Sequence, residues 1–180
     1  QNYIAKLSEK NARLTALEAQ LNPHFLYNTL QAISTEALIN DQFTIHRMIT
    51  SLASNLRYTI KGGDLVPLKS EVQYLSDYIY LLKMRMNDAL VFNIDTEPEL
   101  DDYMIPKISL QALVENSIIH GKSTNKESIE IKVTLTRLPN DRLLISVYDN
   151  GCGISQEQQN KLYQDFESAL TAKNPGGIGL

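Results

Sequence analysis

The segment at residues 149–153, Asp-Asn-Gly-Cys-Gly, combines a carboxylate with two glycines one residue apart. Asp149 follows an alternating apolar stretch, and a carboxylate at the end of a strand can accept a hydrogen bond from an amino group such as that of adenine. Gly151 and Gly153 let the backbone approach a ligand closely, because glycine has no Cβ atom. Asp-Asn-Gly is also an ordinary turn sequence. Taken alone, the segment is compatible with a binding loop or with a simple turn.

Two further clusters have residue types that suit phosphates and their metal ion. The amide oxygen of Asn116 could hold Mg²⁺, which prefers oxygen ligands and keeps several waters. Asn116 could equally be a polar residue at the edge of an apolar core. The run at 176–180, Gly-Gly-Ile-Gly-Leu, includes Gly177 and Gly179, whose backbone N–H groups could cradle phosphates if a helix follows. Its other interpretation is a flexible loop.

Near the other end of the chain, His24 follows Pro23 within a stretch of helical periodicity. We predict one long helix over residues 1 to about 38, with apolar residues on alternating steps of three and four and Asn11 among them. Such a seam is typical of a parallel dimer, although a helix packed within its own chain would also explain it. Pro23 removes a backbone donor and predicts a kink. Sequences break local rules of this kind most often at functional sites, which singles out His24.

The remaining elements must position these residues. A turn at 39–41 and a second helix over about 42–61 predict an antiparallel hairpin, and two hairpins can pair into a four-helix bundle. The glycine pair in segment 61–64 is the best linker candidate. Beyond it the pattern predicts, in order, a helix, a strand, a helix, two hairpin strands and a helix. Their expected ranges are 68–87, 90–94, 106–120, 129–135, 143–148 and 156–168. These predictions give an α+β fold with domains at 1–62 and 63–180.

The composition excludes several classes of function. The formal net charge of −4 gives no broad nucleic-acid footprint, and a single cysteine cannot form an intrachain disulfide. No apolar run reaches the roughly 18 residues of a membrane span. Because the chain begins with Gln1 and stops in a glycine cluster, we expect further sequence beyond both ends. His46 is predicted to be a solvated helix residue, since no motif surrounds it.

The order of the clusters resembles the GHKL ATP-binding fold of histidine kinases, gyrase, Hsp90 and MutL-type ATPases. Upstream, the run at 22–28, Asn-Pro-His-Phe-Leu-Tyr-Asn, closely resembles the phosphoacceptor box of LytS/YesM-type sensor histidine kinases. Residues 78–85 and 110–121 also look like that family. The resemblance spans nearly the whole chain, and it implies a dimeric helical hairpin followed by a GHKL α/β-sandwich that is incomplete at its C-terminal end.

The resemblance implies a role for each motif residue. His24 would take the γ-phosphoryl group of ATP and pass it to an aspartate of a response regulator. Asn28, one helical turn later, would orient water for dephosphorylation of that regulator. Commoner histidine kinases carry an acidic residue after the histidine, whereas Phe25 stands here and cannot act as a base. The implied nucleotide residues are Asn116 for Mg²⁺, Asp149 for the adenine amine, Gly151 and Gly153 for the pocket wall, and Gly177 and Gly179 for the phosphates.

The implied partners are a second copy of the chain and a response regulator, without nucleic acid. The chain would be the cytoplasmic portion of a bacterial membrane protein, attached to the membrane only through an N-terminal sensor region outside this sequence. Two alternatives remain open at this point. The chain could be a catalytically silent dimerisation or regulatory module, or it could be a GHKL ATPase of another class.

Overall fold

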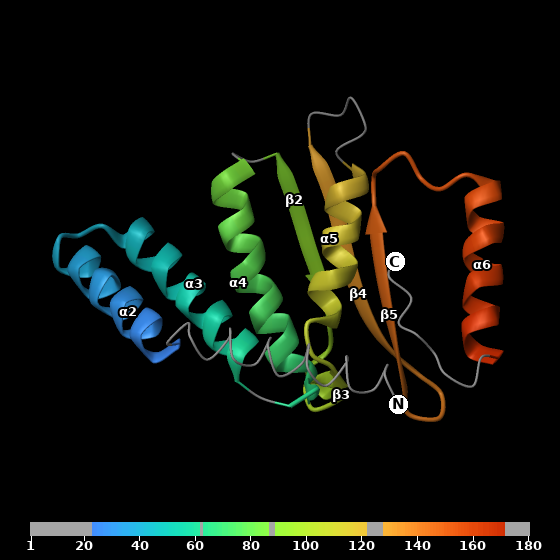
Figure 1. Ribbon diagram of the computed structural model, residues 1–180, viewed down its shortest axis with the longest axis horizontal. Helices are drawn as coiled ribbons and strands as arrows, with labels where there is room; N and C mark the ends of the chain where they lie inside the picture. The colour runs from blue at the N-terminus through green and yellow to red at the C-terminus, as the bar shows by residue number, and fades with distance from the viewer. Residues whose placement is uncertain (1–22, 62, 87–88, 122–127, 172–180) are drawn as a thin grey trace, which may run out of the picture. The chain divides into compact units, whose positions relative to one another are not determined.

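The computed structural model describes residues 23–61, 63–86, 89–121 and 128–171 (Figure 1). The chain divides into two compact units. The first unit comprises Gln1–Met86 and Asp101–Ile108, and the second comprises Asn87–Leu100 and Ser109–Leu180. The chain therefore passes between the units three times. No helix in the described ranges has the length and apolar character required to cross a membrane.

The first unit begins with the predicted hairpin, α2 (Pro23–Ile39) and α3 (Phe43–Ile60). Asp41 in the connecting turn has φ 56°, a left-handed conformation that aspartate tolerates better than most residues. The two helices approach closely because small side chains lie between them, among them Ser34, Ala37 and Ala53. The predicted heptad seam ends at Phe25 and Asn28, which lie on α2, but the rest of it lies outside the described residues. Pro23 is the first described residue of α2, so the predicted kink is not tested.

Helix α4 (Leu68–Met86) packs against α3 through polar contacts. The Ser51 hydroxyl donates to the Asp77 carboxylate over 3.2 Å. The guanidinium of Arg47 lies 4.2 Å from the centre of the Tyr80 ring.

A small sheet completes the first unit. Strand β1 (Leu65–Pro67) pairs antiparallel with β3 (Met104–Pro106), and Leu65 lies opposite Pro106. The helix predicted from residue 106 instead begins at Ser109, because Pro106 belongs to β3 and Ile108 has φ 65°. Three-residue strands are too short to show a period, so the sequence did not predict this sheet.

The second unit contains a three-stranded sheet in the order β2-β4-β5. Its strands are β2 (Leu90–Asp95), β4 (Ile129–Leu138) and β5 (Arg142–Asp149). β2 runs parallel to β4, whereas β4 and β5 form the predicted antiparallel hairpin. A short 3-10 helix, η1 (Pro98–Leu100), follows β2. Every second residue of β4 from Ile129 to Leu135 is buried, as expected for a strand with one covered face.

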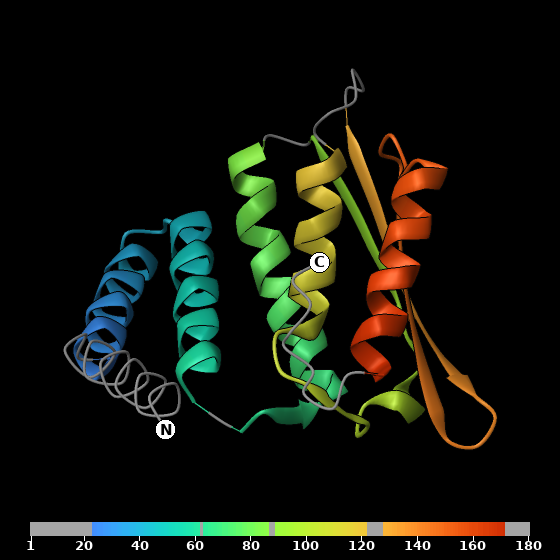
Figure 2. The ribbon, with the colours of Figure 1, turned by 45° about the vertical axis from the view of Figure 1, so that its right-hand side comes forward.

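Helix α5 (Ser109–Gly121) packs on β4 and β5, and both views show it alongside the sheet (Figures 1 and 2). Leu110, Val114 and Ile118, spaced one turn apart, are its buried stripe. Helix α6 (Gln156–Thr171) follows the 149–153 segment. The observed helices and strands confirm the predicted α+β class. The domain boundary at 62 and 63 stays a prediction, and α4 groups with the hairpin in the first compact unit.

Candidate functional site

His24 is an exposed residue in the first turn of α2. Asn28 lies one turn further along the same face, and its amide nitrogen is 3.3 Å from Nδ1 and 3.4 Å from Nε2 of the His24 ring. An amide N–H can donate only to the ring nitrogen that carries no hydrogen. The amide nitrogen of Asn28 is thus nearly equidistant from the two ring nitrogens, and the tautomer decides which of them accepts. The contact restrains the orientation of the ring.

The described part of α2 supplies no carboxylate in the turn that carries His24. The first turn of α2 contains no acidic residue, and Phe25 is 64% exposed beside the histidine. The first turn of α2 therefore offers no side-chain base to His24. Glu18, the nearest upstream acidic residue, lies outside the described residues.

Asp149 ends β5 on the half-buried face of the sheet. It lies opposite the buried Ile131. Side chains along β5 alternate between this face and the exposed face, on which Tyr148 lies. Its Oδ1 accepts a hydrogen bond from the Gly151 backbone N–H over 2.9 Å. The turn and the binding loop that the sequence left as alternatives are thus compatible, because the turn itself holds the carboxylate in place.

Asn150 is a positioning residue that the sequence reasoning missed. Its Oδ1 accepts from the Glu130 N–H over 3.0 Å, and its amide donates to the Ser128 carbonyl over 3.2 Å. Its backbone N–H also donates to the Glu130 carbonyl over 3.2 Å. These bonds fasten the start of β4 beside the end of β5. The sequence did contain one sign of this role, the asparagine next to a turn. Asn side chains can take the place of backbone hydrogen-bond partners at such positions.

The remaining nucleotide candidates lie in the same unit. Gly153 has φ 72°, and apart from its own atoms and its two chain neighbours no atom in the described part of the chain lies within 4 Å of the position that a Cβ would take. Its glycine is therefore required by backbone conformation rather than by lack of space. Asn116 is half-buried on α5, between the buried Val114 and Ile118. Gly177 and Gly179 lie outside the described residues.

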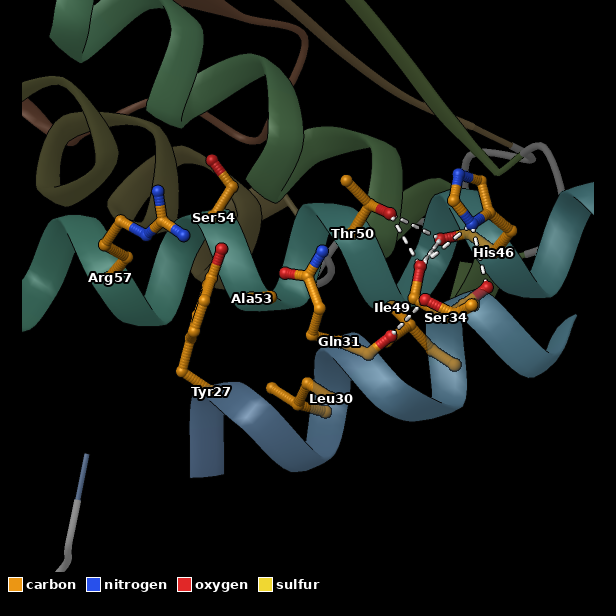
Figure 3. A pocket seen from close by; sticks show the side chains of 11 residues that line it. Tyr27, Leu30, Gln31, Ser34, His46, Ile49, Thr50, Ala53, Ser54 and Arg57 are labelled. Atoms are coloured by element: carbon orange, nitrogen blue, oxygen red, sulfur yellow. Dashed lines mark hydrogen bonds between the residues drawn. The ribbon is translucent and has the colours of Figure 1, made fainter. Parts of the chain in front are cut away.

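His46 is not the solvated residue that the sequence predicted. It is half-buried, and its Nδ1 lies 3.0 Å from the Ser34 carbonyl oxygen and 2.9 Å from the Ser34 hydroxyl (Figure 3). Thr50 joins the same group, with its hydroxyl 3.0 Å from that of Ser34. Because a carbonyl oxygen only accepts, Nδ1 carries the hydrogen. The prediction failed because Ser34 on α2, the other helix of the hairpin, supplies the contacts.

A cavity of about 370 Å³ lies between α2 and α3 and includes this group. At its other end the Arg57 guanidinium lies 4.1 Å from the centre of the Tyr27 ring. Figure 3 shows Tyr27, Gln31 and Ser34 on α2 facing residues of α3 across this space.

Comparisons with known proteins cover most of the chain. Residues 12–90 match the family model described as histidine kinase. Residues 102–180 match the model of histidine kinase-, DNA gyrase B- and HSP90-like ATPases. Among solved structures, the histidine kinase domain of a blue-light activated histidine kinase from Erythrobacter litoralis is 15% identical, with a TM-score of 0.41 over 73% of this chain and 74% of that one.

Two curated relatives align with the chain over both segments. The sensor histidine kinase YesM of Bacillus subtilis is 34% identical over 86% of this chain and 27% of its own length. The sensor protein kinase HptS of Staphylococcus aureus is 30% identical over 88% of this chain and 30% of its own length. The chain thus spans less than a third of these relatives. It belongs to the sensor histidine kinase family, with a histidine kinase segment followed by an ATPase segment of the gyrase B- and HSP90-like type.

Proposed function

We propose that this chain is the autophosphorylating core of a two-component sensor kinase, and that His24 is the residue phosphorylated by ATP. The observation that carries the proposal is the exposed His24 on α2, held by Asn28 and followed in the same chain by an ATPase segment. The phosphoryl group would then pass to an aspartate of a response regulator protein.

Phosphoryl transfer from ATP requires positioning of the reacting groups and charge neutralisation more than covalent catalysis by the protein. A neutral ring nitrogen of His24 attacks the γ-phosphorus, and an N–P bond forms while the P–O bond to ADP breaks. The ring then loses the hydrogen of its other nitrogen. Since the described helix α2 has no carboxylate in its first turn and His24 is exposed, solvent can accept this proton.

The second unit has residues that fit ATP. The Gly151 N–H holds one oxygen of Asp149 and fixes the carboxylate, which would accept from the adenine amine. Gly153 in its left-handed conformation would form part of the pocket wall. Asn116 would contribute an oxygen to Mg²⁺, whose other ligands would be phosphates and water. The Mg²⁺ ion would thus have one protein ligand. The described ranges hold no group of three or more His, Cys, Asp and Glu side chains able to bind a metal ion.

The hairpin has the surface of an incomplete bundle, which supports a homodimer. Several large apolar side chains on α2 and α3 are exposed: Phe25, Leu26, Ile33, Leu38, Ile39, Phe43, Ile45, Leu52 and Ile60. Exposed apolar surface of this extent marks an interface. We propose that a second hairpin covers it in a four-helix bundle, and that a region N-terminal to this sequence attaches the protein to a bacterial cell membrane, with this portion in the cytoplasm.

Incubation of the full-length protein with Mg²⁺ and γ-labelled ATP tests the proposal. We expect label that is stable in alkali and lost in acid, as for a phosphorylated histidine, and its absence from the His24→Gln variant. His46→Gln is the matched control, because it changes the other histidine of the hairpin and should keep the label.

Two results would favour the alternatives. Nucleotide binding without label on the wild-type protein would indicate a catalytically silent module. Steady ATP turnover in a His24→Ala variant would indicate an ATPase of another GHKL class, since such an enzyme needs no phosphorylated histidine.

A further inference from the structure

Helix α2 carries His24 but has no basic residue to balance a charge placed on it. Its sequence contains no lysine or arginine. In the described part of the hairpin the basic residues are Arg47 and Arg57 on α3 and Lys61 directly after it. A phosphoryl group on His24 would bring about two negative charges at neutral pH. Within the hairpin, the balancing cation can come only from α3 or from the residue that follows it.

Arg57 lies in the last turn of α3, at the end of the hairpin where α2 begins. Both views show the last turns of α3 beside the first turns of α2 (Figures 1 and 2). The guanidinium of Arg57 lies 4.1 Å from the centre of the Tyr27 ring. Tyr27 is the third residue after His24, and side chains three apart on a helix are neighbours, with about 5–6 Å between their Cβ atoms. The guanidinium is thus held one side chain away from the histidine.

The Tyr27 ring holds Arg57 in place while leaving its hydrogen-bond donors available. Figure 3 shows both side chains at the same end of the cavity between α2 and α3. A cation over an aromatic face is attracted by the ring, and the planar guanidinium keeps its N–H donors in a fork. In the described part of the chain no carboxylate forms a salt bridge with Arg57. An exposed guanidinium of this kind can form two parallel bonds to the oxygens of a phosphoryl group.

We propose that Arg57 is the phosphoryl-binding residue of the hairpin, and that Tyr27 positions it for that contact. Two N–H groups of Arg57 donate to two oxygens of the phosphoryl group on His24, and the guanidinium offsets the negative charge of that group. The inference rests on the proposed function and adds to it a cation from the same unit as the histidine. The contacts that carry it join α2 and α3 and lie within the first compact unit.

The same helix provides a comparison for a purely structural role. The guanidinium of Arg47 lies on the Tyr80 ring at 4.2 Å, so Arg47 makes the same type of contact as Arg57. The two arginines are ten residues apart, which is about 15 Å along the axis of α3. Arg47→Gln removes an arginine–tyrosine contact and a positive charge far from His24. It is therefore the matched control for Arg57→Gln.

The first measurement is the initial rate of His24 labelling by Mg·ATP in the full-length protein. We expect Arg57→Gln to lower the maximal rate by about tenfold or more, with KM for ATP within about threefold of wild type, because the lost cation acts on the phosphoryl group during transfer. Arg57→Lys keeps the charge without the fork and should lose about threefold. Arg47→Gln and Lys61→Gln remove the other basic residues of the hairpin and should each change the rate by less than about twofold.

The second measurement needs no kinase activity. Phosphoramidate phosphorylates exposed histidines directly, since an N–P bond forms at the ring while ammonia leaves. Phosphorus NMR of the full-length protein treated in this way reports the pKa of each phosphoryl group, and the signal that is absent from His24→Gln belongs to His24. A guanidinium beside this group favours its dianion and lowers its pKa. We expect a higher phosphoryl pKa in Arg57→Gln than in wild type, and an unchanged one in Arg47→Gln.

Tyr27 offers a test that leaves Arg57 in the chain. Tyr27→Leu removes the ring beneath the guanidinium and should slow His24 labelling by about two- to fivefold, because the arginine side chain is then less restrained. Tyr27→Phe keeps the aromatic face and should restore the rate to within about twofold of wild type. Equal losses in the two variants would refute the positioning role of Tyr27.

An unchanged phosphoryl pKa in Arg57→Gln would overturn the proposal, as would equal losses of rate in Arg57→Gln and Arg47→Gln. A larger loss in Lys61→Gln than in Arg57→Gln would assign the contact to Lys61 instead. Wild-type protein that takes no label from ATP would refute the proposed function alone. The phosphoramidate measurement would still decide whether Arg57 contacts a phosphoryl group on His24.

Discussion

Asn28 and His24 form a pair for which we propose two separate roles. The amide nitrogen of Asn28 lies 3.3 Å from Nδ1 of the ring. The amide restrains the ring without supplying any atom to the attack, so its removal leaves the nucleophile intact. The same amide could orient a water molecule once the phosphoryl group has moved to the regulator.

We therefore predict that Asn28→Ala keeps His24 labelling within about threefold of wild type and slows dephosphorylation of the regulator by about tenfold or more. The two rates are measured separately, with labelled ATP and with phosphorylated regulator. Thr29→Ala, an exposed neighbour whose hydroxyl only bonds the Phe25 carbonyl, should alter neither rate. Equal losses of both activities in Asn28→Ala would contradict the assignment.

His46 contributes to stability through its bond to the other helix. We predict that His46→Ala lowers the free energy of unfolding by about 1–2 kcal/mol, because the buried Ser34 loses a hydrogen-bond partner. Urea denaturation measures this difference. His24→Ala on the same hairpin, at an exposed site, should lower it by less than about 0.5 kcal/mol.

Single residues differed in how well the sequence predicted them. His24, Asn116 and Asp149 were predicted as site residues because each lies in a local motif of the chain, and their roles stay predictions. His46, Glu71 and Asn150 were not identified as anchored residues, since their partners lie 12, 37 and 20 residues away in sequence. Contacts of this range depend on the fold, and no local pattern reports them.

At the scale of elements, the β4–β5 hairpin depends on an unusual connection. Asn140 and Asp141 both have left-handed φ values, of 63° and 57°. Asparagine and aspartate tolerate this conformation, but glycine adopts it without a steric cost. The ion pair of Asp141 with Arg137 is exposed and contributes little.

We predict that Asp141→Gly raises the free energy of unfolding by about 0.5 kcal/mol, whereas Asp141→Val lowers it by about 1 kcal/mol or more. Thermal or urea denaturation of the two variants provides the comparison. A stabilised Asp141→Val variant would show that the connection does not require a left-handed residue.

The contact between α3 and α4 predicts a dependence on pH. Burial and the bond to Glu71 raise the pKa of the Tyr58 hydroxyl above its ordinary value of about 10. The unfolded chain then releases this proton at lower pH than the folded one. The contribution of Tyr58 to stability is complete below about pH 10 and is lost as pH rises through the folded-state pKa.

We therefore expect the free energy of unfolding to fall between about pH 10 and 11.5, and to fall less in Tyr58→Phe, which has no proton to lose at this site. Urea titrations of both proteins at several pH values measure the difference. Parallel curves for the two proteins would mean that the hydroxyl titrates alike in the folded and unfolded chains.

Elements of at least six residues were predicted well, and shorter ones were not. The ranges of α3, α4, β2, β4, β5 and α6 agree with the sequence predictions to within a few residues, because each is long enough for its apolar period to be read. β1, β3 and η1 have three residues each and show no period. Helix α5 begins at Ser109 and not at the predicted residue 106, because the backbone N–H of Ile108 is held by Glu71. No helix propensity reports a contact of this kind.

At the scale of the whole molecule, the exposed apolar side chains of the hairpin predict self-association. Ile45 on α3 is 46% exposed. We expect Ile45→Asp to shift the protein from dimer to monomer in light scattering, since a charge would have to be buried in the bundle. Ile119→Asp, at a 65% exposed apolar residue of α5, is the matched control and should leave the mass unchanged.

The order in which the chain is synthesised gives the discontinuous first unit a consequence for folding. Glu71 leaves the ribosome 37 residues before Ile108, its backbone partner, and β1 likewise precedes β3. The hairpin and α4 cannot complete their unit until the first strand of the second one, β2, has also been made. Folding of the two units is therefore interleaved during translation, and a cut after Met86 would leave the first without its last strand.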